Sequence, residues 1–284
     1  MRVGVVGHVE WTRLATAERV PGPGEIVHAT VVWEGPAGGG SVAAVQLARL
    51  AGTCSFFTAL GDDALGRRSA GALAELGVEV RAAARPESTR ECIGLLDDAG
   101  ERTLTTLGNR LEPAAADPLG WEELAGFDAV YFSAGDLGAL RLARAARVLV
   151  ATTRELDALA QGGPTRLDAL VGSVRDRAEA YEPGRLAHPP ELVVLTDGAR
   201  GGTFSVRGKA PEPYAATEVP GPVCDTYGTG DSFAGALTFA LASGHPADKA
   251  IGIAARCAAA ALTGRGPYAA QLTGADLQGG DEPS

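Results

Sequence analysis

The chain of 284 residues contains only two lysines and a single asparagine, Asn109. Lys209 and Lys249 are each followed by alanine, so the Gly-Lys-Ser/Thr step of a P-loop is absent and a Walker-A nucleotide site is excluded. The catalytic loop of protein kinases is missing, and so is the glycine fingerprint that an NAD-type dehydrogenase needs after its first strand. Any phosphate group must therefore be held by other means.

Cysteine, basic charge and long apolar runs are also scarce. The four cysteines are scattered without a C-x-x-C pair, which argues against a disulfide framework or a metal cluster. The formal net charge of −10 disfavours nucleic acid and anionic membranes as partners. No apolar run reaches the roughly 18 residues that cross a bilayer, and the N-terminus turns polar too early for a signal peptide. The sequence thus predicts a cytoplasmic protein with a small-molecule substrate.

The order of the apolar segments predicts an α/β fold. After residue 113, strands and helices alternate, which is typical of a mostly parallel sheet covered by helices on both faces. Two earlier β-rich stretches, at about 9–33 and 88–107, do not fit this alternation. We expect them to form a separate small sheet, with turns at PGPGE (21–25) and DDAGE (97–101).

The stretch DTYGTGD, residues 225–231, comes directly before a long apolar segment with helical periodicity. Glycines at the start of a helix let the backbone approach a ligand, and unpaired N–H groups there favour an anion. A carboxylate at Asp231 would repel that anion unless it acts on another atom, such as the proton of a substrate hydroxyl. The alternative is that Asp231 caps the helix and the glycines form the turn.

Two further glycine-rich stretches precede predicted helices or follow predicted strands. TDGARGG, residues 196–202, follows a strong apolar strand at its carboxyl end, where open α/β sheets bind ligands. Gly38 to Gly40 lead into an Ala/Leu-rich helix that Gly52 ends. Each alone is compatible with a plain turn, but three such junctions in one chain favour a phosphate-binding enzyme.

Together these stretches resemble the ribokinase-like carbohydrate kinases, also called the phosphofructokinase-B family, over nearly the whole chain. DTYGTGD is similar to the family signature D-T-x-G-A-G-D, with Thr229 in place of alanine. Residues 36–52 resemble the family's N-terminal glycine motif, residues 56–78 the segment after it, PGPGE the turn of its β-lid, and TDGARGG its nucleotide contact. The resemblance implies a three-layer α/β/α core with a small β-sheet lid in one domain, residues 1–284.

The resemblance also implies roles for individual residues. Asp231 would be the base that takes the proton from the acceptor hydroxyl, and the amides of Gly228, Thr229 and Gly230 would stabilise the transferring phosphoryl group. Asp225 would lie near a monovalent-cation site, which many members use with K⁺. ATP with Mg²⁺ would be bound by a further set: Thr196, Gly198, Gly201, Ser173, Asp176 and Cys257.

The acceptor end departs from the family pattern. The aspartate that grips substrate hydroxyls is replaced by Thr12, with Glu10 close by, and Val42 stands where an asparagine is usual. The family's N-x-x-E is softened to Ser173-x-x-Asp176, which keeps one hydroxyl and one carboxylate. Gly38 and Gly39 complete the expected acceptor site, and His8, directly after the first strand, is a further candidate contact.

The sequence therefore predicts an ATP-dependent kinase for a small sugar or sugar-like acceptor, with the phosphoryl-transfer end intact. A nucleoside kinase of the same family and a nucleotide- or sugar-binding protein without turnover are the alternatives. The family resemblance also implies a homodimer formed through the β-lid.

Overall fold

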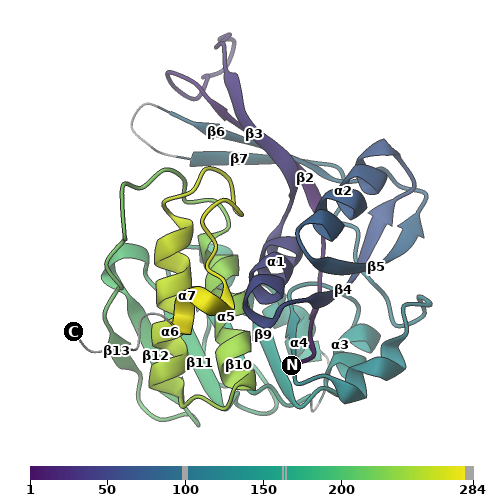
Figure 1. Cartoon of the computed structure of the whole chain (residues 1–284), viewed down its shortest axis with the longest axis vertical. Helices are drawn as coiled ribbons and strands as arrows, with labels where there is room; N and C mark the ends of the chain where they lie inside the picture. Colours follow the sequence, from purple (N-terminus) through teal and green to yellow (C-terminus); the bar gives the residue numbers. More distant parts are fainter. Residues whose placement is uncertain (98–101, 162, 164, 279–284) are drawn as a thin grey trace.

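The computed structural model describes residues 1–97, 102–161, 163 and 165–278. Within these residues the larger sheet has nine strands in the order β13-β12-β11-β10-β9-β8-β1-β4-β5 (Figure 1). The parallel strands are β1 (Val3–Val6), β4 (Cys54–Gly61), β5 (Val78–Arg85), β8 (Ala129–Phe132), β9 (Val148–Thr152), β10 (Ala169–Ser173) and β11 (Leu192–Thr196). Two antiparallel strands, β12 (Gly202–Val206) and β13 (Glu212–Tyr214), complete one edge.

Helices cover both faces of this sheet and confirm the expected three layers (Figure 1). The first face carries α1 (Gly39–Ala51), α2 (Ala64–Glu75), α5 (Thr229–Ala242) and α6 (Ala247–Ala261), with α7 (Gly274–Gln278) beside α1. The opposite face carries α3 (Leu137–Ala143) and α4 (Leu156–Gln161). Because both faces are buried, the central strands are continuous apolar runs such as VGVV in β1. In the described part of the chain, none of the helices has the length and apolarity needed to cross a bilayer.

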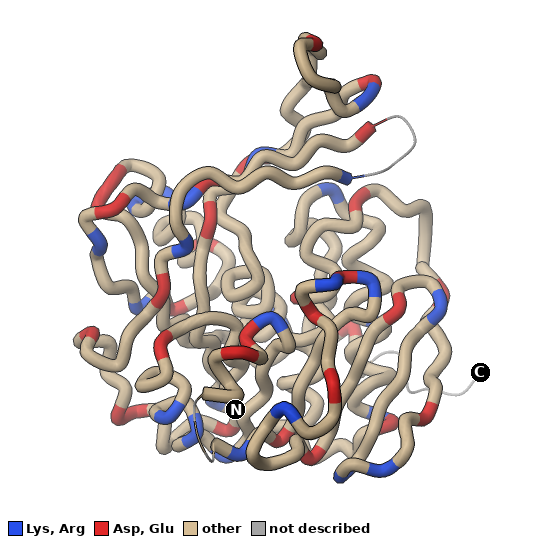
Figure 2. Tube along the Cα trace, turned by 180° about the vertical axis from the view of Figure 1, so that it is seen from behind, with Lys and Arg blue, Asp and Glu red and all other residues tan. Residues whose placement is uncertain are grey.

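A second, small sheet stands apart from the core (Figures 1 and 2). Its order is β3 (Thr30–Ala37), β2 (Glu10–Thr16), β6 (Glu91–Leu96) and β7 (Arg102–Leu107). The central pair β2–β6 is parallel, whereas both outer pairs are antiparallel. Both β-rich stretches expected to leave the core therefore do so, and they pair with each other.

The turns of the small sheet were predicted only in part. The PGPGE turn is confirmed by a hydrogen bond of 3.1 Å from the amide of Glu25 to the carbonyl of Gly22. Of the DDAGE turn, residues 98–101 lie outside the described residues. Strand β5 was not anticipated, because VEVRAAAR has neither a continuous apolar run nor a regular alternation.

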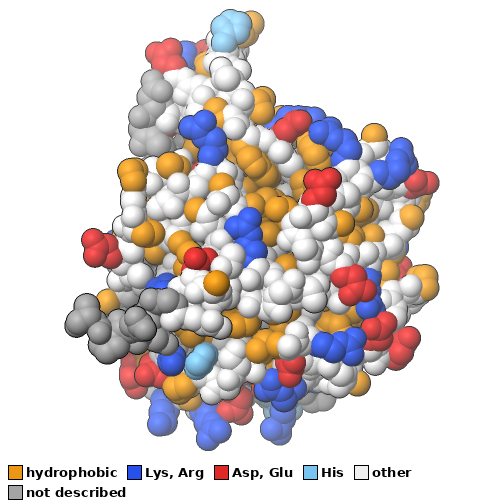
Figure 3. Space-filling view, in the orientation of Figure 1, with side chains coloured by type: hydrophobic (Ala, Val, Ile, Leu, Met, Phe, Trp, Pro, Cys, Tyr) orange, Lys and Arg blue, Asp and Glu red, His pale blue; other side chains and the backbone are white. Residues whose placement is uncertain are grey.

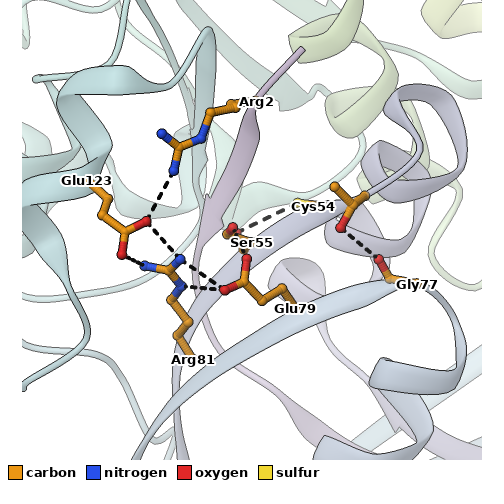
Figure 4. A network of polar contacts seen from close by, with 8 residues as sticks. Arg2, Cys54, Ser55, Gly77, Glu79, Arg81 and Glu123 are labelled. Atoms are coloured by element: carbon orange, nitrogen blue, oxygen red, sulfur yellow. Dashed lines mark hydrogen bonds and ion pairs between the residues drawn. The ribbon is translucent and has the colours of Figure 1, made fainter.

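A polar network holds β5 near the amino ends of the parallel strands (Figure 4). Arg81 donates to both carboxylate oxygens of Glu123, at 2.8 and 3.0 Å, and also to Glu79. Glu79 in turn accepts from the Ser55 hydroxyl at 2.6 Å, and this hydrogen bond keeps its pKa below the usual value. The Arg81 guanidinium also lies 5.2 Å from the centroid of the Phe57 ring. These contacts lie at the end of the sheet opposite the carboxyl ends of the parallel strands.

The junction between β1 and α1 depends on close backbone approach at Gly40. A Cβ atom at this position would lie 2.8 and 2.9 Å from the carbonyl oxygen and amide nitrogen of His8. Both are main-chain atoms, which cannot move aside as a side-chain tip can. We expect Gly40→Ala to lower the free energy of unfolding by about 1–3 kcal/mol, measured by urea denaturation.

Gly71→Ala is the matched control for this substitution. Gly71 lies on the exposed side of α2, and a Cβ there would meet no atom within 4 Å. Because alanine favours helix over glycine, this variant should gain up to about 1 kcal/mol. Equal effects of the two substitutions would contradict the packing at Gly40.

Candidate active site

Charged and polar side chains gather where the parallel strands end. His8 follows β1, Arg154 follows β9, Asp176 follows β10 and Asp197 follows β11. Because these strands are parallel, their carboxyl ends meet at one edge of the sheet, the position where open α/β sheets bind ligands. The small sheet lies above this edge, and hydrophobic side chains gather beneath it (Figure 3).

Helix α5 begins at this edge with a turn that only glycine can form easily. Gly228, the residue before the helix, has φ 75° and ψ 2°, in the left-handed region. A Cβ there would also approach Pro267 to 2.8 Å and a Val42 methyl to 3.0 Å. Gly230, in contrast, has no atom within 4 Å of the place of a Cβ, so the first turn of α5 faces open space. Unpaired N–H groups at such a turn are suited to an anion.

Asp231 lies in the first turn of α5 but does not cap the helix. The cap residue is Gly228, and no side chain forms a capping hydrogen bond. Instead, a Cβ on Gly39 would lie 2.9 Å from Oδ1 of Asp231, so the DTYGTGD and Gly38–Gly40 junctions meet at this carboxyl group. The geometry therefore favours the interpretation of Asp231 as a group that faces a ligand.

The surroundings of Asp231 disfavour its charge. Burial raises its pKa to about 6, with Arg154 acting in the opposite direction and Glu179 and Glu10 adding to the rise. A carboxyl group with this pKa is ionised at neutral pH yet binds a proton more readily than an ordinary aspartate. This is the property expected of a general base.

The carboxyl ends of β10 and β11 form two adjoining cavities of about 210 and 110 Å³. Leu195 and Val174 line both, while Tyr181 lines the larger and Arg200 the smaller. Thr196, at the end of β11, donates from its hydroxyl to the carbonyl of Gly172 at 3.2 Å. The cavities lie where the sequence analysis expects the nucleotide.

The TDGARGG turn after β11 is held by charge. Asp197 accepts from Arg200 at 2.7 Å and from Arg175 at 3.1 Å, and the Arg175 guanidinium lies over Gly198. Gly201 is also required to be glycine, because a Cβ would lie 2.1 Å from the carbonyl oxygen of Tyr214. Gly198 and Gly201 thus shape the turn, and two guanidinium groups stand beside it.

The softened motif after β10 carries an ion pair that the sequence did not suggest. Arg154 pairs with Asp176 at 2.7 Å and with the buried Glu179, also at 2.7 Å. The Ser173 hydroxyl accepts the amide of Arg175 at 3.2 Å. Arg154 therefore brings a positive charge close to both this motif and Asp231.

The oxygen atoms after β10 suit a magnesium ion that is bound mainly by nucleotide phosphates. Ser173, Asp176 and Glu179 present hard oxygen atoms, which Mg²⁺ prefers. Among the described residues, however, no group of three or more His, Cys, Asp and Glu could hold a metal ion. The residues thus fit an ion that arrives with nucleotide phosphates and keeps several waters, rather than an ion in a protein cage.

Glu10 and Thr12 project from β2 toward Tyr227, which precedes Gly228. The Tyr227 hydroxyl donates to Glu10 at 3.3 Å and lies 3.2 Å from the Thr12 hydroxyl. This contact connects the small sheet to the DTYGTGD turn. Arg90 lies on the other side of Glu10, with 3.6 Å between Nε and the carboxylate.

Three residues assigned to ligand contacts are buried by packing instead. Thr12, Val42 and Cys257 have no exposed surface. Val42 lies under Gly228 and supports the turn from behind, while Cys257 lies on the buried face of α6, in the core. In this structure none of the three side chains presents surface to a ligand, so their assignment as direct contacts stays a prediction.

Asp225, the candidate ligand of a monovalent cation, ties two loops together. Its Oδ1 accepts the amide of Tyr227 at 2.9 Å, and its Oδ2 accepts the amide of Gly266 at 3.1 Å. The carboxylate is buried, and both oxygens are used by backbone donors. Its evident role is to fix the DTYGTGD turn against residues 264–268.

His8 lies next to the Gly38–Gly40 junction, where its Nε2 is 3.0 Å from the place of a Cβ on Gly38. Burial, followed by the charges of Arg110, Arg90 and Arg154, lowers its pKa to about 3. His8 is therefore neutral at physiological pH, and its buried Nδ1 has no hydrogen-bond partner within the described residues. It is available to a ligand as a neutral donor or acceptor.

Comparison with known proteins adds a family and a fold. A sequence profile described as pfkB family carbohydrate kinase matches residues 2–143 and 137–273. Acarbose 7(IV)-phosphotransferase of an Actinoplanes strain is 40% identical over 73 residues, which are 25% of this chain and 24% of that protein. The chain thus spans about a quarter of the length of this curated relative in the matched segment.

Solved structures share the fold over nearly the whole chain. The Arabidopsis thaliana ribokinase complexed with ribose and ATP superposes with a TM-score of 0.75 at 19% identity, covering 98% of this chain and 97% of that one. The adenosine kinase of Sinorhizobium meliloti gives 0.75 at 18% identity and 98% of both chains. These likenesses confirm the expected ribokinase-like α/β fold.

The raised pKa of Asp231 predicts a pH-dependent effect on stability. The folded state binds a proton at this carboxyl more tightly than the unfolded chain, so burial of the charge destabilises the protein above pH 6. Asp231→Asn should therefore stabilise the protein at pH 8 by about 3 kcal/mol, because the pKa rises from 3.8 to about 6 and each pKa unit corresponds to roughly 1.4 kcal/mol. This gain should fade as the pH falls from about 6 to about 4, in urea unfolding series.

Asp225→Asn provides the contrast. Because Asp225 accepts two buried backbone amides, its loss should lower stability at pH 8. An Asp231→Asn variant that is less stable than wild type at pH 8 would show that the carboxylate is structural.

Proposed function

Because the chain belongs to the pfkB family of carbohydrate kinases, we propose that it transfers the γ-phosphoryl group of ATP to a hydroxyl group of a small sugar or sugar-like acceptor. The observation that carries this proposal is the place of Asp231. Its carboxyl group lies at the open first turn of α5, facing Gly39, with a raised pKa and no capping role. We also propose a cytoplasmic location, where ATP is available to the enzyme.

In the proposed step, the acceptor oxygen attacks the γ-phosphorus of ATP in line with the β,γ-bridging oxygen. The new O–P bond forms while the bond from phosphorus to the bridging oxygen breaks, and ADP leaves with that electron pair. The hydroxyl proton passes to Asp231 and then to solvent, so the carboxylate is regenerated. A base with a pKa of about 6 accepts this proton and releases it again at neutral pH.

The backbone at Gly228, Thr229 and Gly230 would stabilise the charge that develops on the phosphoryl oxygens. Gly230 faces open space, so nothing obstructs a phosphoryl group at its amide. The nucleotide would lie along the two cavities at the ends of β10 and β11, beside Thr196 and Tyr181. Mg²⁺, when bound with ATP, would neutralise phosphate charge, and Ser173, Asp176 and Glu179 would offer it oxygen atoms.

We treat the small sheet as a lid inserted into a single kinase domain. It would close over the acceptor and exclude water, which otherwise competes with the acceptor hydroxyl for the phosphoryl group. Its outer face exposes Val31, Ile93 and Leu107, by 53%, 37% and 47%. Apolar side chains of this kind suit contact with the lid of a second copy, so we also propose a homodimer.

Substitution of the base should abolish most of the activity. Asp231→Asn keeps the size of the side chain but cannot accept the proton, so turnover should fall by about 10² or more. Turnover is measured as ADP release in the presence of ATP, Mg²⁺ and a panel of sugars, sugar acids, sugar phosphates and nucleosides. Asp248→Asn, an acidic first-turn residue of α6, is the control and should leave turnover unchanged.

Two outcomes would contradict the proposal. Full activity of the Asp231→Asn variant would exclude this carboxyl as the base. Acceptor-independent binding of ADP, with no ADP release for any acceptor, would indicate a nucleotide-binding protein without turnover.

The pH profile should depend on Arg154. Activity should rise as Asp231 loses its proton, with a midpoint near pH 6. The Arg154 charge lowers the pKa of Asp231, and its loss also leaves Glu179 unpaired nearby. Arg154→Gln should therefore move the midpoint of the kcat profile to higher pH, whatever its effect on maximal rate.

Arg144→Gln tests whether this shift is specific. Arg144 pairs with Asp168 on the far side of the core and should leave the midpoint unchanged. A midpoint that stays in place or moves to lower pH in Arg154→Gln would show that Arg154 does not act on the base.

A further inference from the structure

The face of the small sheet that covers the site carries two arginines. Side chains alternate along a strand, and paired residues of neighbouring strands share a face. Thr12, which contacts Tyr227, pairs with Cys92 of β6. Two residues before Cys92, Arg90 therefore projects to the same side. Strand β7 adds Arg102, since its partner Leu96 is four residues from Cys92 and lies on that face.

Arg102 is held over the site, and it forms no ion pair with any carboxylate among the described residues. Its guanidinium carbon lies 5.2 Å from the centroid of the Tyr227 ring. Its Nε and Nη1 atoms are buried, and neither donates a hydrogen bond to any residue that the structure describes. A buried guanidinium nitrogen without an acceptor is costly, so its place in the fold calls for a partner that binds there.

Arg90 is only partly compensated. Its Nε lies 3.6 Å from the Glu10 carboxylate, beyond hydrogen-bond distance, and is itself buried without a hydrogen bond. The same carboxylate accepts the Tyr227 hydroxyl. Among the described residues of this face, Glu10 is thus one negative charge beside the two positive charges of Arg90 and Arg102.

The charges of these arginines reach the groups beneath the lid. The positive charge of Arg102 lowers the pKa of Asp231, and that of Arg90 lowers the pKa of His8. Two further arginines near His8 already have carboxylate partners: Arg110 pairs with Glu155, and Arg154 with Asp176 and Glu179. Free donor capacity is therefore concentrated on the lid.

We propose that the acceptor carries, besides the hydroxyl that reacts, an anionic group that Arg102 binds with the help of Arg90. This inference rests on the proposed phosphotransfer and names the class of acceptor. A carboxylate or a phosphate monoester offers two oxygen atoms in the geometry that a guanidinium group recognises. The anionic group takes no part in the transfer and leaves the reaction unchanged.

The proposal explains why the acceptor end lacks the usual side chains that hydrogen-bond sugar hydroxyl groups. Val42 and Thr12 are buried, so neither can hold a sugar hydroxyl. A neutral sugar would leave Arg102 without a partner, whereas an anionic acceptor would satisfy it. Specificity would then come from one charged group rather than from several hydroxyl contacts.

The experiment compares neutral and anionic forms of one acceptor. ADP release is measured with glucose, gluconate and glucose 6-phosphate, and with ribose, ribonate and ribose 5-phosphate. We expect an anionic member to give a kcat/KM at least tenfold above that of its neutral parent. The carboxylate and phosphate arms show which of the two anions is bound.

Arg102→Gln should raise the KM for the anionic acceptor by about 10–100-fold, with kcat within about threefold and the KM for ATP unchanged. Arg102→Lys keeps the charge but loses the planar, two-pronged geometry of the guanidinium group. Its KM for the anionic acceptor should lie between those of the wild type and Arg102→Gln. The control is Arg13→Gln, because Arg13 lies on the outer face of the same sheet and pairs with Glu91 and Glu34. Arg13→Gln should leave kcat, the KM for the anionic acceptor and the KM for ATP unchanged.

The outcomes separate this inference from the proposed function. Equal use of neutral and anionic acceptors, unaffected by Arg102→Gln, would overturn the anion site and leave the kinase intact. The absence of ADP release with every acceptor in the panel would overturn the proposed kinase activity. In that case the melting temperature decides the anion site: a rise with an anionic compound in wild type but not in Arg102→Gln supports it, and no rise overturns it.

Discussion

The structure is organised around one unfavourable placement, a carboxyl group held in surroundings that oppose its charge. Asp231 stays there because α5 begins at a left-handed glycine and because Gly39 leaves room for the carboxylate. Burial raises the pKa, and the nearby arginines limit that rise. The stability lost by burying the charge is the cost of a base that can exchange a proton at neutral pH.

Around this carboxyl group the two ends of the site use different physical means. Toward β10 and β11, backbone turns and ion pairs around Asp197 and Arg154 shape a surface for phosphates. Toward the small sheet, apolar packing and two incompletely paired arginines replace hydroxyl-binding side chains. The first end is suited to a feature common to all nucleotides, and the second to a property of one acceptor.

The fold was largely predictable from the sequence, and the site only in part. Buried parallel strands and glycine-ended helices follow from local patterns, so most of the core was predicted. Strand β5 was missed because Glu79 and Arg81 interrupt its apolar residues. Asp231 and the glycine turns could be proposed from the sequence because their spacing is local. Arg154, Glu179 and Tyr227 were not identified, although a search for charged residues directly after each strand would have found Arg154.

The positions of Arg90 and Arg102 required strand register, which depends on the pairing of segments far apart in the sequence. The burial of Thr12, Val42 and Cys257 depends on tertiary packing, which spacing does not reveal.

The parallel pairing of β2 with β6 has a consequence for how the molecule assembles. Residues 11 and 91 are partners, and between them the chain forms β3, α1, β4, α2 and β5. Closing so long a loop is entropically expensive unless the core has already brought its ends together. The small sheet should therefore form after the core, and it should be the least stable part of the folded molecule. An enzyme whose acceptor cover is the last element to fold is also one in which that cover can open without disturbing the rest.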